Sequence, residues 1–438
     1  MAQGDMMSEP IRDRTIRSLP TAPVRHGRLR RSHAWTTIVA VTAGALAVVL
    51  VSGASVAAIS LAQFNANIDV VDLVAAPGEE PRVIPTIGEW EGGFNVLIVG
   101  IDNDGRQSDA SRRDGAVLND VNILVHVAED KQSAVAVSFP RDLVIPIPSC
   151  PDPDGEGSSF AMSAQPLNVA YSVGELNCVV LTLEELTGLD IPYAGTISFS
   201  GVARLSTAVG GVDVCVDGPI NDRYTGLSLP SAGTWTLEGK TALAFLRTRH
   251  GVGDGSDLGR ISSQQVYLSS LIRKVQNEGV LTDFTKLYGL AQVATSSMQL
   301  SRSLASLDTM VSMAQALHGI PTENIVFVQY PTYYGSGVNA GKVLPRTTPA
   351  AALLERISND ERFTLEEGNT GVGSTIDPNA PTGEPSPTPE PTETTPPKNG
   401  KVEPEVEPTL PPVDTTPPGV LEDVPGQTAA DYTCSVAN

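Results

Sequence analysis

The feature that most constrains this chain is an uncharged apolar run of 27 residues, 36–62. A helix of this length is long enough to cross a bilayer. Seven arginines and three acidic residues precede the run, and positive charge is typically retained on the cytoplasmic side. The pattern predicts a cytoplasmic segment (1–35), one transmembrane helix (36–62) and an extracytoplasmic remainder. A cleaved signal peptide is the alternative, although its apolar region is usually shorter, about 7–15 residues.

The charge of the chain is unevenly distributed. The net charge is -21, and because residues 1–34 carry +4, the remaining 404 residues carry -25. A surface of this sign repels phosphate backbones, which excludes a general nucleic-acid binder. Any anionic ligand of the acidic part therefore requires a local cluster of arginines.

Composition divides the extracytoplasmic part into three regions. Residues 63–92 contain Pro and Gly and are expected to form a stalk. Residues 378–425 hold 15 of the 34 prolines, mixed with Thr and Glu, which favours extended, unpacked chain. We therefore expect a folded domain at 93–367 and a disordered tail at 368–438.

The four cysteines all lie after the apolar run, where thiols tend to oxidise. Two disulfides are possible in three connectivities. Cys150 and Cys178 flank a loop rich in Pro, Asp, Gly and Ser, which favours that pair. Unpaired buried cysteines are the alternative.

Strand and helix patterns alternate within the expected domain. Short continuous apolar runs at 95–99, 121–127 and 134–139 are typical of strands covered on both faces. Helical patterns occupy 179–187, 202–209 and 238–246. The alternation predicts an α/β fold in three layers, with a central sheet between helices.

A longer helix is expected at 257–277. Asp257 is its predicted N-cap. Its buried side is expected to carry the large apolar residues at helical spacing, which are Ile261, Leu268, Leu271, Ile272 and Val275.

Arginines supply the pattern that could carry chemistry. Arg247 and Arg249 are two residues apart, so an extended segment turns both to one side. Arg260 and Gln264 share a helix face, and Arg141 follows a strand, where α/β folds place ligands. Four fixed guanidiniums in an acidic domain could hold a diphosphate. Ion pairing with the 47 acidic residues after residue 34 is the alternative.

Two carboxylates accompany these arginines. Asp102 follows the first expected strand and Asp120 precedes the second, so both could reach one sheet edge. Carboxylates beside bound phosphate often share a Mg²⁺ with it. Helix capping or turn formation by these aspartates is the alternative.

Nine short blocks of this sequence resemble, in order, those of LytR-CpsA-Psr (LCP) proteins. They read NVLIVGID (95–102), LNDV (118–121), SFPRD (138–142), LNVAY (167–171), FSGV (199–202), GGVDV (210–214), AFLRTRH (244–250), DLGR (257–260) and QQ (264–265). The resemblance implies a central mixed sheet between helices and an apolar slot for a polyprenyl chain.

The resemblance also implies an activity. Members are similar to membrane-anchored phosphotransferases, which move a glycopolymer from a polyprenyl-pyrophosphate carrier to the C6 hydroxyl of muramic acid in peptidoglycan. The catalytic domain would face the cell wall, with membrane lipid, lipid-linked glycopolymer and peptidoglycan as partners. A hydrolase of the lipid-linked glycan and a non-enzymatic wall-polymer binder or transcriptional attenuator are the alternatives.

Carried over residue by residue, the resemblance assigns roles to the site. The pyrophosphate ligands would be Arg141, Arg247, Arg249 and Arg260, with Gln264 beside them. Asp102 and Asp120 would hold Mg²⁺ or activate the acceptor hydroxyl, and the catalytic set is Asp102, Asp120 and Arg141. The chain departs from the family at Leu118, Pro166 and Ser263, where many members have a basic residue; Arg112 or Arg113 could substitute.

Overall fold

The protein is represented by a computed structural model of all 438 residues. It describes residues 35, 38–39, 41–44, 52, 68–82, 93–102, 117–153, 155, 157–277, 284–380 and 419–438. The chain divides into two compact units, 1–61 and 62–438. The described residues of the first unit are helical, but most of the predicted 36–62 span lies outside the described residues. No helix within the described ranges is long and apolar enough to cross a bilayer.

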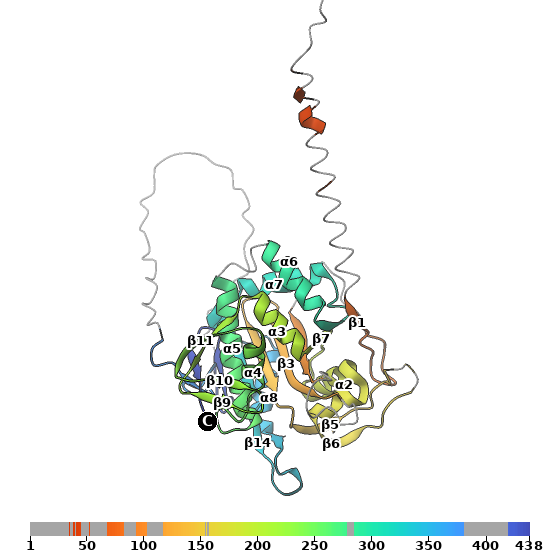
Figure 1. Ribbon diagram of the computed structural model, residues 1–438. Coiled ribbons are helices and arrows are strands. Elements are labelled where there is room, and N and C mark those ends of the chain that lie inside the picture. The colour runs from red at the N-terminus through yellow and green to blue at the C-terminus, as the bar shows by residue number, and fades with distance from the viewer. Residues whose placement is uncertain are drawn as a thin grey trace, which may run out of the picture. The chain divides into compact units, whose positions relative to one another are not determined.

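The second unit is built on a mixed sheet of eight strands (Figure 1). Pairs of parallel and antiparallel strands both occur, as a mixed sheet requires. In spatial order the strands are β1 (Asp69–Val71), β12 (Met298–Ser301), β7 (Tyr193–Ser198), β2 (Phe94–Ile101), β3 (Asn119–Val127), β4 (Ala134–Phe139), β13 (Ile325–Gln329) and β19 (Gly426–Thr428). The three strands predicted from apolar runs are therefore the centre of this sheet.

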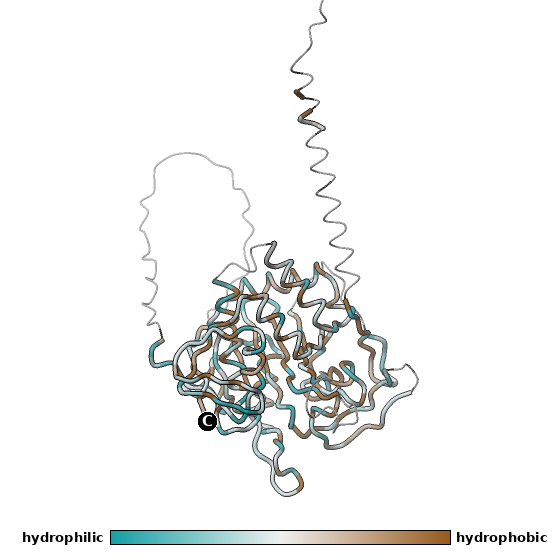
Figure 2. The backbone as a smooth tube through the Cα atoms, in the orientation of Figure 1, coloured by the Kyte–Doolittle hydropathy of each residue, from teal (hydrophilic) through white to brown (hydrophobic). Residues whose placement is uncertain are grey.

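Helices cover both faces of the sheet and complete the three-layer α/β arrangement expected from the sequence. On one face, α2 (Ala170–Thr187) and α8 (Thr347–Ser358) pack on Leu97 and Val99 of β2. The other face carries α3 (Phe199–Ala208), α5 (Asp257–Asn277), α6 (Phe284–Thr295) and α7 (Leu307–Gly319). Hydropathy alternates along these helices in Figure 2, which is typical of helices with one buried side. Gly188 ends α2 in the left-handed conformation, at φ 71°.

A second, smaller core lies beside the main sheet. Its sheet has the order β11 (Gly233–Leu237), β8 (Val212–Val216), β20 (Thr433–Ser435) and β17 (Ser374–Ile376). Helix α4 (Gly239–Arg247) and the pair β9 (Ile220–Asp222) and β10 (Leu227–Leu229) pack on it. The remaining elements are β5 (Val144–Ile147), β6 (Met162–Pro166), β14 (Thr332–Tyr334), β15 (Val343–Pro345), β16 (Phe363–Leu365), β18 (Gly419–Leu421), η2 (Leu167–Val169), η3 (Thr322–Asn324) and η4 (Gly337–Asn339).

The structure corrects the expected ends of the folded domain. The predicted stalk contains β1, which pairs with β12 in the main sheet. The predicted disordered tail contains β17 to β20, and β19 extends the main sheet beside β13. Composition failed here because the proline-rich average masked a short apolar segment whose Leu421, Val424 and Cys434 are buried. Residues 381–418, which hold most of these prolines, lie outside the described residues.

Both disulfides are formed, and all four cysteines are paired. Cys150–Cys178 confirms the favoured pair. Cys215–Cys434 links β8 to β20, which are 219 residues apart in sequence. The second bridge ties the end of the chain to the smaller core.

The last strands approach the start of α5 very closely. A Cβ added at Gly373 would lie 2.0 Å from the carbonyl oxygen of Gly259, so only glycine fits there. One turn further along α5, the Ser263 and Ser435 hydroxyls are 2.7 Å apart. The end of the chain therefore packs against the helix that carries Arg260.

Ending the chain at residue 380 should destabilise it. This truncation removes β18, β19 and β20 and uncovers the edge of β13. We expect the free energy of unfolding to fall by more than the roughly 2–4 kcal/mol typical of losing one disulfide. Urea unfolding measures this loss, with the double variant Cys215→Ser and Cys434→Ser as the control that keeps the strands. An unchanged midpoint in the truncated chain would restore the disordered-tail hypothesis.

Candidate functional site

Three strand ends bring the predicted carboxylates and Arg141 to one edge of the main sheet. Because β3 runs antiparallel to both β2 and β4, the start of β3 lies beside the ends of its neighbours. Asp102 follows β2, and its Oδ1 accepts a hydrogen bond from the Leu118 amide at 2.9 Å. Asp120 lies in β3, and its Oδ1 accepts one from Arg141 Nη1 at 2.6 Å. The expected shared edge for Asp102 and Asp120 is confirmed.

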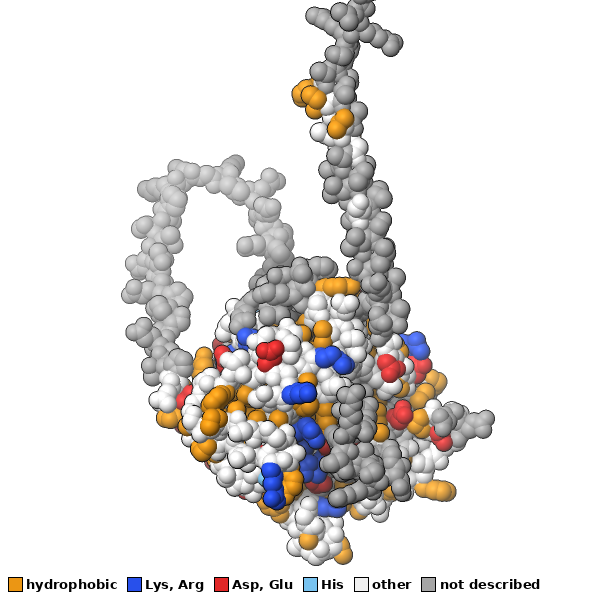
Figure 3. Space-filling model, viewed as in Figure 1, with side chains coloured by type: hydrophobic (Ala, Val, Ile, Leu, Met, Phe, Trp, Pro, Cys, Tyr) orange, Lys and Arg blue, Asp and Glu red, His pale blue; other side chains and the backbone are white. Residues whose placement is uncertain are grey.

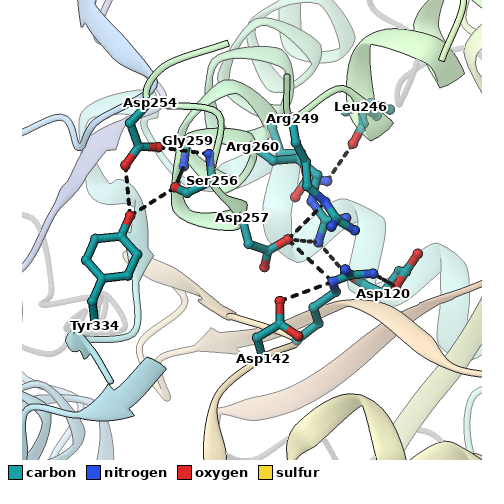
Figure 4. A network of polar contacts seen from close by, with 12 residues as sticks. Asp120, Asp142, Leu246, Arg249, Asp254, Ser256, Asp257, Gly259, Arg260 and Tyr334 are labelled. Carbon is teal, nitrogen blue, oxygen red and sulfur yellow. Dashed lines mark hydrogen bonds and ion pairs between the residues drawn. The ribbon is translucent and has the colours of Figure 1, made fainter. Parts of the chain in front are cut away.

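A cluster of arginines lies next to Asp120 and surrounds one carboxylate (Figure 4). Oδ1 of Asp257 lies 2.7 Å from Arg260 Nη2, 3.5 Å from Arg249 Nε and 3.7 Å from Arg141 Nε. Arg260 Nη2 also donates to the backbone oxygen of Asp120 at 2.6 Å. The side chains of Asp257 and Arg260 are 9% and 4% exposed, whereas those of Arg141 and Arg249 are 20% and 28% exposed, so water screens the Asp257–Arg260 pair least.

Asp257 does not have the predicted capping role. In the first turn of α5 the Gly259 amide donates to Ser256 Oγ at 3.3 Å, while Asp257 turns to the arginines. The carboxylate oxygens of Asp257 are buried and make no well-aligned hydrogen bond, so ion pairing alone holds it. The sequence signal that could have identified it was its position three residues before Arg260 on the same helix.

The charges shift the pKa values of this cluster. Burial disfavours the Asp120 carboxylate, but Arg141, Arg260 and Arg249 outweigh burial, so its pKa lies below the usual value. Burial, together with the charges of Arg260 and Arg141, lowers the pKa of Arg249 to about 10. Both groups therefore stay charged at neutral pH.

A polar cavity of about 220 Å³ opens beside this cluster. Arg247, Arg249 and Arg260 line it together with Asp120, whereas Arg141 reaches it only through its bond to Asp120. Figure 3 shows basic side chains gathered along the middle of one face of the molecule. Converging guanidiniums of this kind can bind a diphosphate through paired hydrogen bonds.

An apolar cavity of about 450 Å³ adjoins the polar one. The two share four lining residues, Val121, Phe199, Leu246 and Arg247. The guanidinium carbon of Arg247 lies 4.1 Å from the centre of the Phe199 ring, at this junction. A ligand with a phosphate group and a long apolar chain can occupy both cavities at once.

The apolar cavity changes the interpretation of α5. Of the five residues expected on the buried side of this helix, only Ile261 is fully buried. The other four line the cavity: Leu268, Leu271, Ile272 and Val275. Gln264 also lines the cavity, and its amide donates to the Leu246 backbone oxygen at 2.7 Å, which fixes the end of α4 next to Arg247.

The three departures from the family pattern have distinct surroundings. Leu118 contributes its amide to Asp102, and Ser263 bonds the C-terminal strand. Pro166 pairs with Val144 at the end of β6. Leu118, Pro166 and Ser263 therefore contribute no positive charge to the site. The possible substitutes Arg112 and Arg113 lie outside the described residues.

Asp102 and Asp120 suit a Mg²⁺ ion by their chemistry. Both offer carboxylate oxygens at one strand edge, and Asp120 lines the cavity that can hold phosphate. Mg²⁺ usually takes one or two carboxylates and completes its shell with waters and substrate phosphate. Within the described ranges the one group of three close ligand-type side chains is Cys215, Asp377 and Cys434, and its cysteines are joined in a disulfide. The two aspartates therefore fit an ion that depends on substrate for the rest of its ligands.

Comparison with known proteins identifies similar chains. A sequence model of the LytR_cpsA_psr family matches residues 63–355. The chain is 28% identical over 267 residues to the cell wall biosynthesis protein LcpA of Corynebacterium glutamicum, covering 55% of this chain and 50% of that protein. It is 29% identical over 258 residues to the polyisoprenyl-teichoic acid–peptidoglycan teichoic acid transferase TagT of Bacillus subtilis, covering 57% and 73%.

A solved structure supports the fold. Protein gbs0355 from Streptococcus agalactiae superposes with a TM-score of 0.50 at 20% identity, over 62% of this chain and 88% of that one. The chain thus spans about half the length of the LcpA relative and most of the gbs0355 structure.

Inorganic pyrophosphate should stabilise the protein through the arginine cluster. At about 100 times its Kd, a ligand that binds only the folded state adds about 2.7 kcal/mol to the free energy of unfolding. Asp257→Asn should lower the melting temperature without ligand, because three guanidiniums lose a shared counter-charge, and pyrophosphate should recover part of that loss. Thermal unfolding with and without pyrophosphate tests both effects, with Arg346→Ala as a control outside the site. An equal pyrophosphate shift in Arg249→Ala and in the unchanged protein would contradict binding at this cluster.

Proposed function

Because the chain belongs to the LytR-CpsA-Psr family, we propose that it is a glycopolymer–peptidoglycan phosphotransferase. The observation that carries the proposal is the junction at Arg247, where an apolar cavity of about 450 Å³ meets a cavity lined by arginines. This combination matches a donor whose pyrophosphate joins a polyprenyl chain to a glycan. The name of the TagT relative describes a transfer from a polyisoprenyl-linked polymer to peptidoglycan.

The finer features of the proposal follow the same chemistry. The carrier is a polyprenyl pyrophosphate, and the acceptor is the C6 hydroxyl of a muramic acid residue in peptidoglycan. We place the protein in the cell membrane as a single-pass protein, with its N-terminus in the cytoplasm and the catalytic domain facing the wall. The 27-residue apolar run and its basic flank support this topology.

The reaction replaces one phosphorus–oxygen bond by another. The acceptor oxygen bonds to the glycan-linked phosphorus while the bond from that phosphorus to the bridging oxygen breaks. The lipid phosphate leaves with the electron pair, and the hydroxyl proton passes to a carboxylate. Arg247, Arg249 and Arg260 stabilise the charge that moves onto the leaving phosphate, since they line the polar cavity.

The two carboxylates are suited to different tasks. Asp120 already compensates Arg141, and its lowered pKa makes it a weak base. Asp102 is buried, and the Leu118 amide fixes its orientation, so it is the better candidate for accepting the hydroxyl proton. A Mg²⁺ held by Asp102 and Asp120 would supply further charge stabilisation at the phosphate oxygens.

Removing a cavity arginine should weaken donor binding. Arg247→Ala and Arg249→Ala should each cost about 1.5–3 kcal/mol of binding free energy for a polyprenyl-pyrophosphate glycan, the range for a hydrogen bond to a charged group. The melting temperature should change little. Donor titration and thermal unfolding measure these two quantities. Large losses of stability with normal donor affinity would indicate structural ion pairing instead.

Removing a carboxylate should slow transfer rather than weaken binding. Asp102→Ala should lower Mg²⁺-dependent turnover while donor affinity stays close to that of the unchanged protein, because the proton and the ion matter most as charge moves. Asp120→Ala should do the same and also lower stability, since Arg141 loses the nearest of its carboxylate partners. Attachment of labelled glycan to peptidoglycan oligomers, with and without chelator, reports the effect. Release of free glycan to water, without attachment, would favour the hydrolase, and donor binding without turnover would favour the non-enzymatic binder.

Filling the apolar cavity should discriminate against long lipid chains. Leu271→Trp places a larger ring among the cavity-lining residues of α5, and each buried methylene of the lipid contributes about 0.8 kcal/mol. We expect a long-chain donor to bind at least about tenfold more weakly, while a short-chain donor keeps its affinity. Asn277→Trp, at the exposed end of the same helix, is the matched control. Equal affinities for both donors in Leu271→Trp would remove this cavity from the lipid-binding hypothesis.

A further inference from the structure

A second polar recess, of about 290 Å³, lies at the edge of the main sheet that carries Asp102. None of the roles proposed above uses it. Its volume is close to the lower end for small-molecule sites, about 300–1,000 Å³. Its polar lining includes Tyr171, Thr196, Ser198, Arg204, Ser297 and Gln299.

The recess lies at the edge of the sheet, between Tyr171 of α2 on one face and Arg204 of α3 on the face that carries the apolar cavity. In β7, Ile197 lines the apolar cavity, whereas its neighbours Thr196 and Ser198 line the recess. Successive side chains of a strand point to opposite faces. In β2 the apolar cavity is lined by Ile98 and Gly100, and the recess by Ile101. Asp102 comes directly after Ile101, so it lies where the two faces meet.

The lining of the recess suits an uncharged sugar. Hydroxyl, amide and guanidinium groups can donate to and accept from the hydroxyl and acetamido groups of a sugar unit. Arg204 is held in place, since its Nε donates to Ser297 Oγ at 2.9 Å. Gln299 Nε2 lies 3.5 Å from Asp69 Oδ1 on the neighbouring strand. The Tyr171 ring adds a partly apolar wall, and burial, with Glu175 and Asp69 nearby, raises its pKa to about 12, so its hydroxyl keeps its proton.

The recess also has the right position for an acceptor. In phosphoryl transfer the attacking and leaving oxygens lie roughly in line on opposite sides of phosphorus. A lipid phosphate leaving toward the apolar cavity therefore requires the hydroxyl to arrive from the other side. The recess takes the β7 side chains that point away from the apolar cavity, Thr196 and Ser198, and it borders the end of β2 at Ile101, the residue before Asp102.

We propose that this recess is the acceptor subsite, which binds one sugar unit of a peptidoglycan strand and directs its hydroxyl toward Asp102. The proposal rests on the transferase function proposed above. It assigns Arg204 and Gln299 to acceptor binding and gives them no role in donor binding.

Two variants of the full chain test the subsite. Arg204→Met removes the guanidinium but keeps an apolar stem of similar length. Gln299→Trp fills the recess from β12 instead of α3, and it keeps the test valid if loss of the Ser297 contact unfolds the first variant. Arg346→Met is the matched control: Arg346 lines another polar recess, of about 260 Å³, where it pairs with Asp423 at 3.1 Å.

The measurements separate the acceptor from the donor. With a polyprenyl-pyrophosphate disaccharide as donor and soluble uncrosslinked peptidoglycan strands as acceptor, KM for the acceptor should rise about tenfold in Arg204→Met and Gln299→Trp. Donor Kd and the rate of glycan release to water should stay within about twofold of the unchanged protein, because neither residue lines the donor cavities. Arg346→Met should leave all of these quantities unchanged.

Other outcomes overturn the subsite or the transferase function separately. An unchanged acceptor KM in the folded variants, or a parallel loss of donor affinity, would overturn the acceptor subsite and leave transfer intact. If the unchanged protein binds the donor but attaches nothing to peptidoglycan, the transferase function fails. Direct titration of the protein with peptidoglycan strands then tests whether the recess binds a sugar unit. Binding weakened about tenfold by both variants supports the acceptor subsite, and binding unaffected by them overturns it.

Discussion

The site depends on the ion pairing of three arginines that converge on one carboxylate. Arg141, Arg249 and Arg260 all approach Oδ1 of Asp257, and Arg141 also binds Asp120. Asp142 also pairs with Arg141 at 3.5 Å, and Asp222 lines the polar cavity together with Arg247. Four arginines and four carboxylates therefore surround the site, and the carboxylates hold the guanidiniums in place without ligand. The guanidiniums that line the cavity can still donate paired hydrogen bonds to an anion, although the chain as a whole is strongly acidic.

The end of the chain holds this cluster in position. The loop between Arg249 and Arg260 is fastened by backbone bonds from Gly253 N to Val436 O at 2.9 Å and from Asn438 N to Gly251 O at 3.1 Å. Cys434 joins the same terminal segment to β8. The last residues of the sequence thus set the distance between two arginines that occur almost two hundred positions earlier. The segment that composition assigned to a disordered tail is part of the framework of the site.

The central sheet separates the hydrophobic and polar halves of the site. Alternation along β2 and β7 turns one set of side chains to the apolar cavity and the other set to the α2 face. Asp102, Asp120 and Arg141 lie at the ends of the central strands, at the edge where these two halves adjoin. The same pleat that builds the core therefore places the apolar cavity, the arginine-lined cavity and the polar recess around one edge.

Several of these features could be predicted from the sequence. Continuous apolar runs identified the central strands, because burial on both faces leaves no polar alternation. Two-residue and four-residue spacings grouped Arg247 with Arg249 and Arg260 with Gln264, since local backbone geometry decides which side chains share a side. The loop composition between Cys150 and Cys178 favoured the correct partner. All of these inferences involve residues close together in the chain or patterns within one element.

The tertiary structure alone decided the partners of residues that are far apart in sequence. Asp257 was predicted to be a helix cap but lies at the centre of the arginine cluster, because Arg141 reaches it from the turn after β4, more than a hundred residues earlier. Leu268, Leu271 and Ile272 were expected in the core but line a cavity. The sequence could not show this, because a packed core and an apolar cavity are lined by the same types of residue. The pairing of β19 with β13 and of β20 with β8 depends on edges that only the folded sheets present. Local composition and periodicity indicate which residues prefer burial. The packing of distant elements determines which side chains, or which cavity, each of these residues contacts.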